Sequence, residues 1–418
     1  MFIPITEMPE DLARYLNSYK NELSKPQQEH FQTYVTGLII CEGKRTISNL
    51  NATKLPGERK DDTSVSRFAN QYKWSEEAID RRRMAIARKE IITWLDNRVG
   101  GRPVTTYLIF DDSTHEKTGL QIAGAGSFRT GTGYKWGKKM VSSLLRVGPF
   151  AVPYWGDLYL KKEYCETEGL EFRTTTRMVR EQILSFEPLP GTEETCLLTD
   201  SWFSGEPIVS AVKSRENEGF YLISGMKKSR NIYRRDGSKV NLETRASELG
   251  RQHYEKVKVN GRLFYVHRYE GKVSKAGEDP CVVLICRNDF SDPEDEPFFI
   301  LCTKTGLTRQ QIIVRYLKRW GIETGYRNGK QLLGQDEYQG RSVLGTIRHW
   351  CLGRTAYTYL ELRRVNSLLT QNRDQALNTL GDVCRVVKRE VVRCLVDWLF
   401  GIFQEGQNVN FACQLLGI

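Results

Sequence analysis

Hydrophobic residues recur every three or four positions over the first hundred residues, a spacing that predicts amphipathic helices. The predicted helices span 26–41, 46–50, 64–72 and 75–95. Gly43 interrupts the pattern between the first two, and the basic residues Lys44 and Arg45 follow it. A helix-turn-helix module and a plain helical bundle both fit this arrangement. We therefore expect residues 1–100 to form a helical region.

From residue 104 the pattern changes to short runs of β-branched and aromatic residues, which predict strands. The predicted strands span 104–111, 120–126, 141–147 and 195–200, and a helix is predicted at 173–186 before the last of them. Strands mixed with helices in this order favour a mixed α/β fold.

Further strands are predicted between residues 211 and 300, at 256–259, 263–268 and 281–287. The pair Asn260-Gly261 is a strong hairpin signal between the first two. Helical spacing returns in the tail, over Leu380, Val383, Val387, Val391, Leu395 and Leu399. The pattern does not decide whether this helical region, 366–418, packs on the rest of the chain or carries a dimer contact.

The most specific pattern lies at 316–330. Tyr316, Arg319, Glu323 and Lys330 step by three, four and seven, so they project from one face of a helix. A carboxylate among a phenol, a guanidinium and an ammonium suits a site that handles phosphate together with a metal ion. A surface helix with ion pairs between successive turns is the structural alternative.

Two aspartates follow apolar runs upstream of this helix. The run 104–110 ends at the acidic pair Asp111-Asp112, and the run 195–199 ends at Asp200. With Glu323, neighbouring strand ends would supply three carboxylates, a set that suits two magnesium ions about 4 Å apart. Each aspartate alone also fits a capping role at the turn that follows its strand.

On these residues the chain resembles the DDE transposases of bacterial insertion sequences, in the branch with a Tyr-x2-Arg-x3-Glu-x6-Lys helix. Asp111, Asp200 and Glu323 match the three catalytic acids of that family. The family pattern Asp-x-Ser/Thr fits both Asp111 and Asp112 as the first acid, and we favour Asp111, which comes first after the apolar run. The resemblance covers about residues 25–365.

The resemblance implies a ribonuclease-H-like catalytic core at 101–210 and 301–365. A β-rich insertion at 211–300 would interrupt this core, and the helical regions 1–100 and 366–418 would flank it. In the family, the N-terminal region binds the terminal repeats of the element, and the insertion closes over DNA and assists cleavage by a hairpin route.

The resemblance also implies chemistry and partners. Two Mg²⁺ ions, replaceable by Mn²⁺, would assist cleavage of the element ends and transfer of the 3′-hydroxyl to target DNA. The expected partners are the terminal inverted repeats, target DNA and a second copy of the chain on DNA. Tyr316, Arg319 and Lys330 would contact phosphates.

A basic segment follows the second aspartate. Lys227, Lys228 and Arg230 lie within a few residues of one another, just after a predicted strand. A clamp on the DNA backbone and an ordinary solvated charge run are both consistent with them.

Composition agrees with a DNA partner. The formal net charge is +11 and the sequence pI is about 9.1, which favours an acidic polymer. The ten cysteines form no metal-binding pattern and favour a reducing cytoplasm. The sequence contains no run of 18 apolar residues, so no membrane span is predicted.

Two other functions stay open at this level. One is a DNA-binding regulator derived from a transposase but without catalysis, against which the intact carboxylates argue. The other is a ribonuclease-H-like nuclease that cleaves without strand transfer, because its metal chemistry would be the same.

Overall fold

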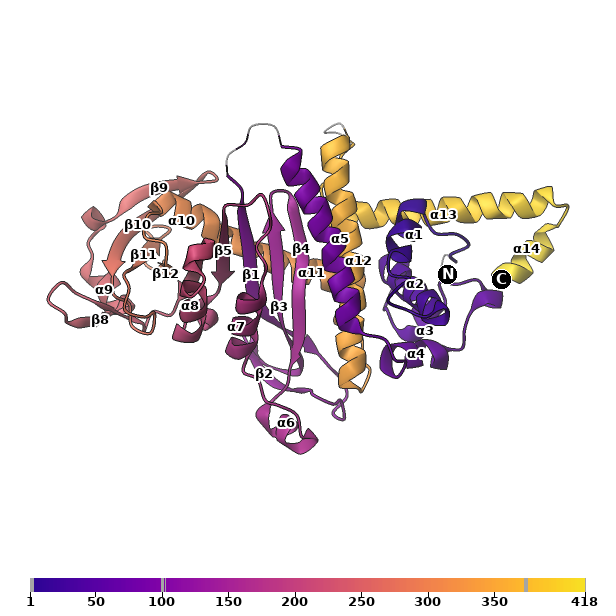
Figure 1. The fold of residues 1–418 in the computed structure, drawn as a ribbon, viewed down its shortest axis with the longest axis horizontal. Helices are drawn as coiled ribbons and strands as arrows, with labels where there is room; N and C mark the ends of the chain where they lie inside the picture. The colour runs from indigo at the N-terminus through magenta and orange to yellow at the C-terminus, as the bar shows by residue number, and fades with distance from the viewer. Residues whose placement is uncertain (1–3, 99–100, 102, 372–374, 418) are drawn as a thin grey trace.

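The computed structural model describes residues 4–98, 101, 103–371 and 375–417. A ten-stranded sheet runs through the molecule, with helices on both of its faces, and the helices of the two chain ends lie together beyond one edge (Figure 1). The mixed α/β fold class with helical regions at both ends is therefore confirmed.

Five strands form the centre of the sheet in the order β4-β3-β1-β5-β6. Their bounds are Thr105–Glu116 for β1, Gly133–Val147 for β3, Phe150–Tyr159 for β4, Glu194–Thr199 for β5 and Phe220–Met226 for β6. The strand β3 runs antiparallel to β1 and β4, whereas β5 is parallel to both β1 and β6. This is the arrangement of a ribonuclease-H-like core.

The strands after β6 extend the same sheet. In sheet order, β6 is followed by β12 (Phe298–Cys302), β11 (Cys281–Arg287), β10 (Arg262–Gly271) and β9 (Glu255–Val259). Asn260 and Gly261 join the last two with positive φ angles of 49° and 79°, as their hairpin signal predicts. A separate small hairpin, β7 (Asn231–Tyr233) with β8 (Lys239–Asn241), precedes α9 (Leu242–Glu248).

Two strand predictions in the core are wrong, and one strand of the core was missed. The first strand does not end at Asp111 but continues to Glu116, because β3 pairs with it as far as Gly137. Residues 120–125 form no strand, and β2 (Gly126–Thr130) begins only where the chain returns to β3. The strand β4 was not predicted at all, since Pro153 and Gly156 interrupt its pattern.

Alternation along β1 assigns the helices to the two faces of the sheet. Leu108 and Phe110 pack in one core cluster with α5 (Glu76–Asp96), α7 (Thr175–Ser185) and α8 (Glu206–Lys213). Tyr107 and Ile109 pack in another cluster with α10 (Arg309–Tyr316) and α11 (Trp320–Leu333). Each face of β1 therefore meets a different set of helices, as the two-residue period of a strand requires. The short helix α6 (Lys162–Glu168) follows β4.

The two chain ends form one helical bundle. Its helices are α1 (Glu10–Asn17), α2 (Lys25–Ile40), α3 (Ile47–Asn51), α4 (Asp62–Asn70), α12 (Val343–Thr370), α13 (Leu380–Gln404) and α14 (Val409–Leu416). Ten residues of α2 are buried, and α2 packs against both α12 and α13. In the tail, Val383 and Val387 are buried as predicted, whereas Leu395 and Leu399 stay partly exposed because α13 projects away from the body (Figure 1). None of the helices within the described ranges is long and apolar enough to cross a membrane.

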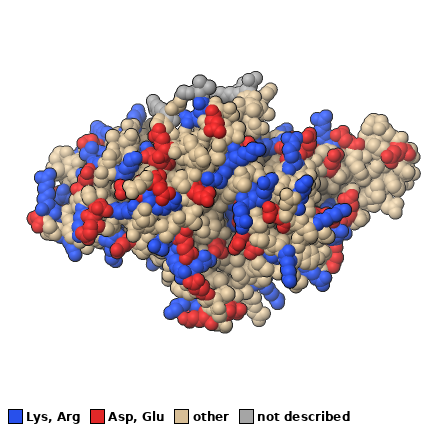
Figure 2. Space-filling model, viewed as in Figure 1, with Lys and Arg blue, Asp and Glu red and all other residues tan. Residues whose placement is uncertain are grey.

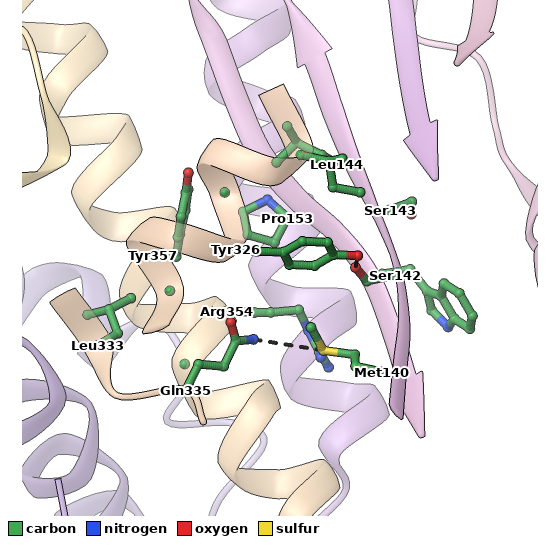
Figure 3. A pocket seen from close by; sticks show the side chains of 15 residues that line it. Met140, Ser142, Ser143, Leu144, Pro153, Tyr326, Leu333, Gln335, Arg354 and Tyr357 are labelled. Atoms are coloured by element: carbon green, nitrogen blue, oxygen red, sulfur yellow. Dashed lines mark hydrogen bonds between the residues drawn. The ribbon is translucent and has the colours of Figure 1, made fainter. Parts of the chain in front are cut away.

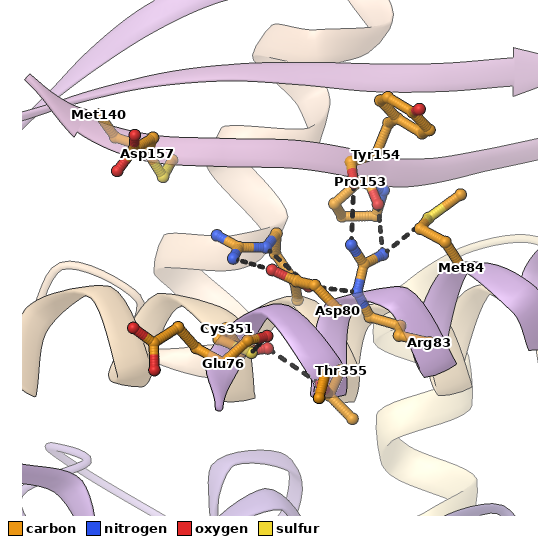
Figure 4. A network of polar contacts seen from close by, with 12 residues as sticks. Glu76, Asp80, Arg83, Met84, Met140, Pro153, Tyr154, Asp157, Cys351 and Thr355 are labelled. Atoms are coloured by element: carbon orange, nitrogen blue, oxygen red, sulfur yellow. Dashed lines mark hydrogen bonds and ion pairs between the residues drawn. The ribbon is translucent and has the colours of Figure 1, made fainter. Parts of the chain in front are cut away.

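A buried polar network joins α5 to α12 and β4 (Figure 4). Arg83 has no exposed surface, and it donates to Asp80 Oδ1 at 2.8 Å, to the Tyr154 carbonyl oxygen at 2.9 Å and to the Pro153 carbonyl oxygen. Arg354 of α12 pairs with Asp80 from the other side. The network fixes α5 against the sheet.

Candidate catalytic site

The register of the sheet places the two aspartates side by side. Pairing between β1 and β5 ends at Ile109 and Leu198, and Asp111 and Asp200 each lie two residues beyond that last pair. Beyond it, β1 continues along β3 alone while the chain leaves β5 for a short 3-10 helix. The two carboxylates therefore meet where parallel strands part, a common place for ligand sites in α/β sheets.

The pleat of β1 separates Asp111 from Asp112. Asp111 follows Tyr107 and Ile109 in the alternation, so it faces α11, and its side chain is 20% exposed. Asp112 falls on the other register and pairs with Lys139 of β3, with Nζ and Oδ2 3.0 Å apart. This geometry favours Asp111 as the first acid of the site.

The signature residues line one side of a helical segment, although not of one regular α-helix as expected. Tyr316 is the last residue of α10, Leu317–Arg319 form a 3-10 turn, and α11 begins at Trp320. Arg319 Nη2 donates to Glu323 Oε1 at 2.9 Å, and Arg319 Nη1 lies 3.7 Å from Asp111 Oδ2. Lys330 Nζ reaches the carbonyl oxygen of Thr114 on β1 at 3.5 Å.

Tyr316, at the end of α10, reaches the same site by packing against Gly225 of β6. A Cβ added to Gly225 would lie 2.8 Å from the Tyr316 hydroxyl and 3.2 Å from the backbone nitrogen of Ser201. The absence of a side chain at Gly225 therefore lets Tyr316 approach the loop that follows Asp200. All four signature residues, together with Asp111 and Asp200, lie around the point where the pairing of the central strands β1 and β5 ends.

The two aspartates oppose each other's ionisation. Burial and the charge of Asp200 raise the pKa of Asp111 to about 7. Burial also raises the pKa of Asp200, although the backbone N–H of Trp202 donates to its Oδ1 at 2.9 Å and Arg319 lies nearby. The capping role considered for Asp200 is thus present together with its place in the site.

Several supporting residues were missed in the sequence. The Tyr326 hydroxyl donates to the Asp111 carbonyl oxygen at 2.9 Å and lies 2.8 Å from Ser142 Oγ of β3 (Figure 3). Ser224 Oγ donates to the Asp200 carbonyl oxygen at 2.8 Å. Tyr326 lies three residues after Glu323, so helical spacing could have indicated it, whereas the contact of Ser224 depends on the strand order.

The cavity next to Tyr326 is not a substrate site. It lies between β3, α11 and α12 and has a volume of about 40 Å³, room for roughly one or two water molecules (Figure 3). Its lining is mostly apolar, and the carboxylates of Asp111, Asp200 and Glu323 do not line it.

The basic segment divides into two parts. Lys227 Nζ lies 4.9 Å from the ring centre of Trp202, two residues after Asp200, and Lys228 pairs with Glu243 at 2.8 Å. Arg230 instead donates to the Ser204 and Ser274 carbonyl oxygens at 3.2 and 3.0 Å. Arg230 therefore holds the loop after Asp200 in place, whereas the two lysines lie at the surface.

The carboxylates fit divalent cations by their chemistry. Hard oxygen donors are the ligands that Mg²⁺ prefers, and a bound cation would relieve the repulsion between Asp111 and Asp200. Within the described ranges, no three Asp, Glu, His or Cys side chains lie close enough together to hold a metal ion. Arg319 contacts both Asp111 and Glu323 instead, so its guanidinium provides the positive charge at the site.

Two protein-family models match this chain. Residues 18–263, more than half of the chain, match the family model described as DDE superfamily endonuclease. The chain belongs to the DDE endonuclease superfamily. A second model, described as transposase DDE domain, matches residues 172–359. The first match includes Asp111 and Asp200, and the second includes Asp200 and Glu323.

No match was found among curated proteins. The family assignment nevertheless makes the chain a DDE-type transposase, a metal-dependent enzyme that acts on DNA.

Proposed function

We propose that this DDE enzyme is the transposase of a bacterial insertion sequence and that Asp111, Asp200 and Glu323 are its catalytic acids. The observation that carries the proposal is the register of β1 and β5, which aligns Asp111 with Asp200 beneath the helix of Glu323. The three acids would hold two Mg²⁺ ions, with Mn²⁺ as a substitute. When bound, the ions would supply the Lewis acidity that activates an attacking oxygen and stabilises the leaving oxygen of a phosphodiester.

The protein residues around the acids position DNA. Arg319, Tyr316 and Lys330 would bind phosphates next to the scissile bond. A phosphate would draw the Arg319 guanidinium away from Asp111 and Glu323 and leave both carboxylates free for metal. Lys227 and Lys228 would contact the backbone near the loop after Asp200, and Arg230 keeps that loop in position.

The remaining regions bind and arrange the substrate. Residues 1–100 would recognise the terminal inverted repeats. The catalytic core would comprise 101–210 and 301–365 together with β6, which completes the five-stranded core. The rest of the β-rich segment 211–300 would close over the cleaved end and support a hairpin route in a cut-and-paste reaction. Two copies would act together on DNA in the bacterial cytoplasm, with 366–418 as a region that supports this assembly.

Cleavage of DNA that carries the inverted repeats flanking the gene tests the assignment. Asp111→Asn, Asp200→Asn and Glu323→Gln should each abolish Mg²⁺-dependent cleavage, because each removes one hard ligand with little change in volume. DNA binding and the unfolding temperature should stay close to wild type. Mg²⁺-dependent cleavage by any one of these variants would remove that residue from the catalytic set.

Joining to target DNA separates transposition from simple cleavage. The wild-type enzyme should produce molecules in which the 3′ end of the element is covalently joined to an added plasmid. Cleaved ends without joined products would make the protein a nuclease.

A further inference from the structure

The helix α5 presents a row of cations to solvent. Arg81, Arg82, Ala85 and Lys89 are exposed along it, and Arg88 between them is half-buried. Lys and Arg side chains gather over this helix in the space-filling view (Figure 2). We call Arg81, Arg82, Arg88 and Lys89 the α5 basic face.

No carboxylate neutralises the α5 basic face within the described residues. Arg82 Nε donates to the Ser18 carbonyl oxygen at 2.9 Å, and Arg88 donates to the Glu187 carbonyl oxygen at 3.0 Å. Arg81 and Lys89 have no hydrogen-bond or ion-pair partner there. Backbone oxygens hold two of the cations in place, and none of the four forms an ion pair with a carboxylate in the described part of the chain, unlike the cations of ordinary surface ion pairs.

The face lies on a rigid support between two hollows. The neighbouring Arg83 is buried and ties α5 to β4 and α12 (Figure 4). A hollow of about 740 Å³ separates α5 from α7, and one of about 590 Å³ separates it from α1 and α12. Their linings add neutral donors such as Gln182, Ser185 and Asn366, which suit phosphate and sugar oxygens. The linings also contain carboxylates, namely Asp80 and Glu187 in the first hollow and Asp11 and Glu90 in the second, so phosphates would contact the cations at the rim and not the floor of either hollow.

We propose that the α5 basic face binds the backbone of a DNA duplex on the side of the sheet opposite α11. This segment of DNA would be distinct from the one that reaches Asp111 and Asp200, because those carboxylates face α11. The proposal rests on the proposed function for its partner and goes beyond it in assigning the surface.

The geometry of the helix favours duplex DNA over an acidic protein segment. Arg81 and Lys89 are eight residues apart, about 12 Å along the helix, close to the width of about 12 Å of the major groove of B-DNA. Cations at the two ends can therefore reach phosphates on both sides of one groove. The small side chain of Ala85 between them leaves room for close approach.

The segment that first suggested a helix-turn-helix offers no comparable surface. The second helix, α3, is only five residues long, and Arg45 at the joint donates to the Leu332 carbonyl oxygen at 2.8 Å. Most of α2 is buried in the bundle. The exposed cations of residues 1–100 are thus more concentrated on α5 than on α2 and α3.

Charge reversal tests the surface in the full-length protein without metal. Arg81→Glu/Lys89→Glu should weaken binding of a labelled duplex by at least about tenfold and lower the salt slope by about two, one per lost phosphate contact. The matched control is Arg129→Glu/Lys162→Glu on β2 and α6, which makes the same charge change on exposed residues outside the regions proposed to contact DNA. The control should bind like wild type, and equal loss in the two variants would reduce the effect to net charge and overturn the proposal.

Two further measurements keep the test decisive. If the reversed variant is unstable, Arg81→Gln/Lys89→Gln should still lower the salt slope by about two. A photo-cross-linking residue in place of Ala85 should capture DNA, whereas one in place of the exposed Thr167 on α6 should not. Absence of cross-linking at position 85 in protein that binds DNA would contradict the proposal.

The outcomes separate this proposal from the proposed function. Asp111→Asn should still bind the duplex and cross-link through position 85 although it does not cleave. Normal affinity of Arg81→Glu/Lys89→Glu would overturn the role of α5 even if the enzyme transposes. Loss of cleavage in the carboxylate variants bears only on the catalytic assignment.

Discussion

Two clusters of arginine and carboxylate side chains in this protein contain the same chemical groups in opposite proportions. At the base of α5, Asp80 lies between Arg83 and Arg354, one carboxylate with two guanidinium groups. Where β1 and β5 part, Arg319 lies between Asp111 and Glu323 with Asp200 nearby, one guanidinium among three carboxylates. The first cluster has an excess of positive charge and the second an excess of negative charge.

The surroundings stabilise the excess positive charge of the first cluster but not the excess negative charge of the second. Carbonyl oxygens of Pro153 and Tyr154 accept from Arg83, so its remaining donors are satisfied. Burial works to raise the pKa of Asp80, but Arg354 and Arg83 outweigh it and hold that pKa below its ordinary value. The pKa of Asp111 lies far above its ordinary value, at about 7. A site with an excess of negative charge in the free protein is ready for a cation, which is how perturbed carboxylates indicate function.

Breaking the structural cluster should have the largest effect on stability. Asp80→Asn removes the charge between two buried arginines, and loss of one partner from such a pair costs about 3–5 kcal/mol. Urea or thermal unfolding of the purified variant measures the loss. Stability within about 1 kcal/mol of wild type would show that Asp80 does not hold α5 in place.

Neutralising one carboxylate of the candidate site should raise the folding stability instead of lowering it. In metal-free protein, Asp111→Asn should stabilise the fold, by on the order of 2–4 kcal/mol at pH 8. Below about pH 4 Asp111 does not lower the folding stability, because its carboxyl group is protonated in both the native and the unfolded protein. The cost grows as pH rises to about 7, the folded pKa, because only the unfolded chain has lost its proton in that window.

The measurement is the pH dependence of the unfolding free energy in both proteins. The gain in unfolding free energy from Asp111→Asn should fall towards zero as the pH falls to about 4. At pH 8, added Mg²⁺ should reduce the difference in unfolding free energy between the variant and wild type. A variant less stable than wild type at pH 8 without metal would show that Asp111 is not strained by its neighbours.

Removing the competing cation should change metal affinity by a smaller amount. Arg319→Gln should raise the affinity of the DNA-free protein for Mn²⁺ by roughly tenfold, about 1.4 kcal/mol, because its guanidinium no longer neutralises Asp111 and Glu323. Calorimetric titration measures this. Arg327→Gln is the matched control, an exposed arginine on the same helix, and should leave the affinity unchanged. Equal affinities in the two variants would separate Arg319 from the metal site.

The smallest effect is expected at Asp112. Asp112→Asn breaks only a partly exposed pair with Lys139, worth about 0–1 kcal/mol, and should leave cleavage within roughly threefold of wild type. An inactive Asp112→Asn beside an active Asp111→Asn would reverse our choice between them.

Spacing along the sequence identified residues that the structure brings together, but not their surroundings. The steps from Tyr316 to Lys330 and the aspartates after apolar runs are local patterns, and the structure places them near the point where β1 and β5 part. The continuation of β1 to Glu116 could not be found in this way, because it depends on pairing with β3, far along the chain. The choice between Asp111 and Asp112 needed the pleat of β1 for the same reason.

The cations were the hardest to interpret. Arg81, Arg82 and Arg83 form one basic run, yet the third is buried and the first two are exposed. Which of these arginines is buried depends on the side of α5 that faces β4, and the sequence alone does not show which side that is. Arg230 likewise looked like a surface cation beside Lys227 until its carbonyl partners were seen.

The central claim is that Asp200 binds the catalytic metal directly. Cleavage by Asp200→Cys, compared in Mg²⁺ and in Mn²⁺, tests it, because a thiolate is a poor ligand for Mg²⁺ and a better one for the softer Mn²⁺. The account predicts an inactive enzyme in Mg²⁺ and partial recovery in Mn²⁺, while Asp200→Asn stays inactive in both. Full activity of Asp200→Cys in Mg²⁺, or no activity with either ion in folded, DNA-bound protein, would contradict it.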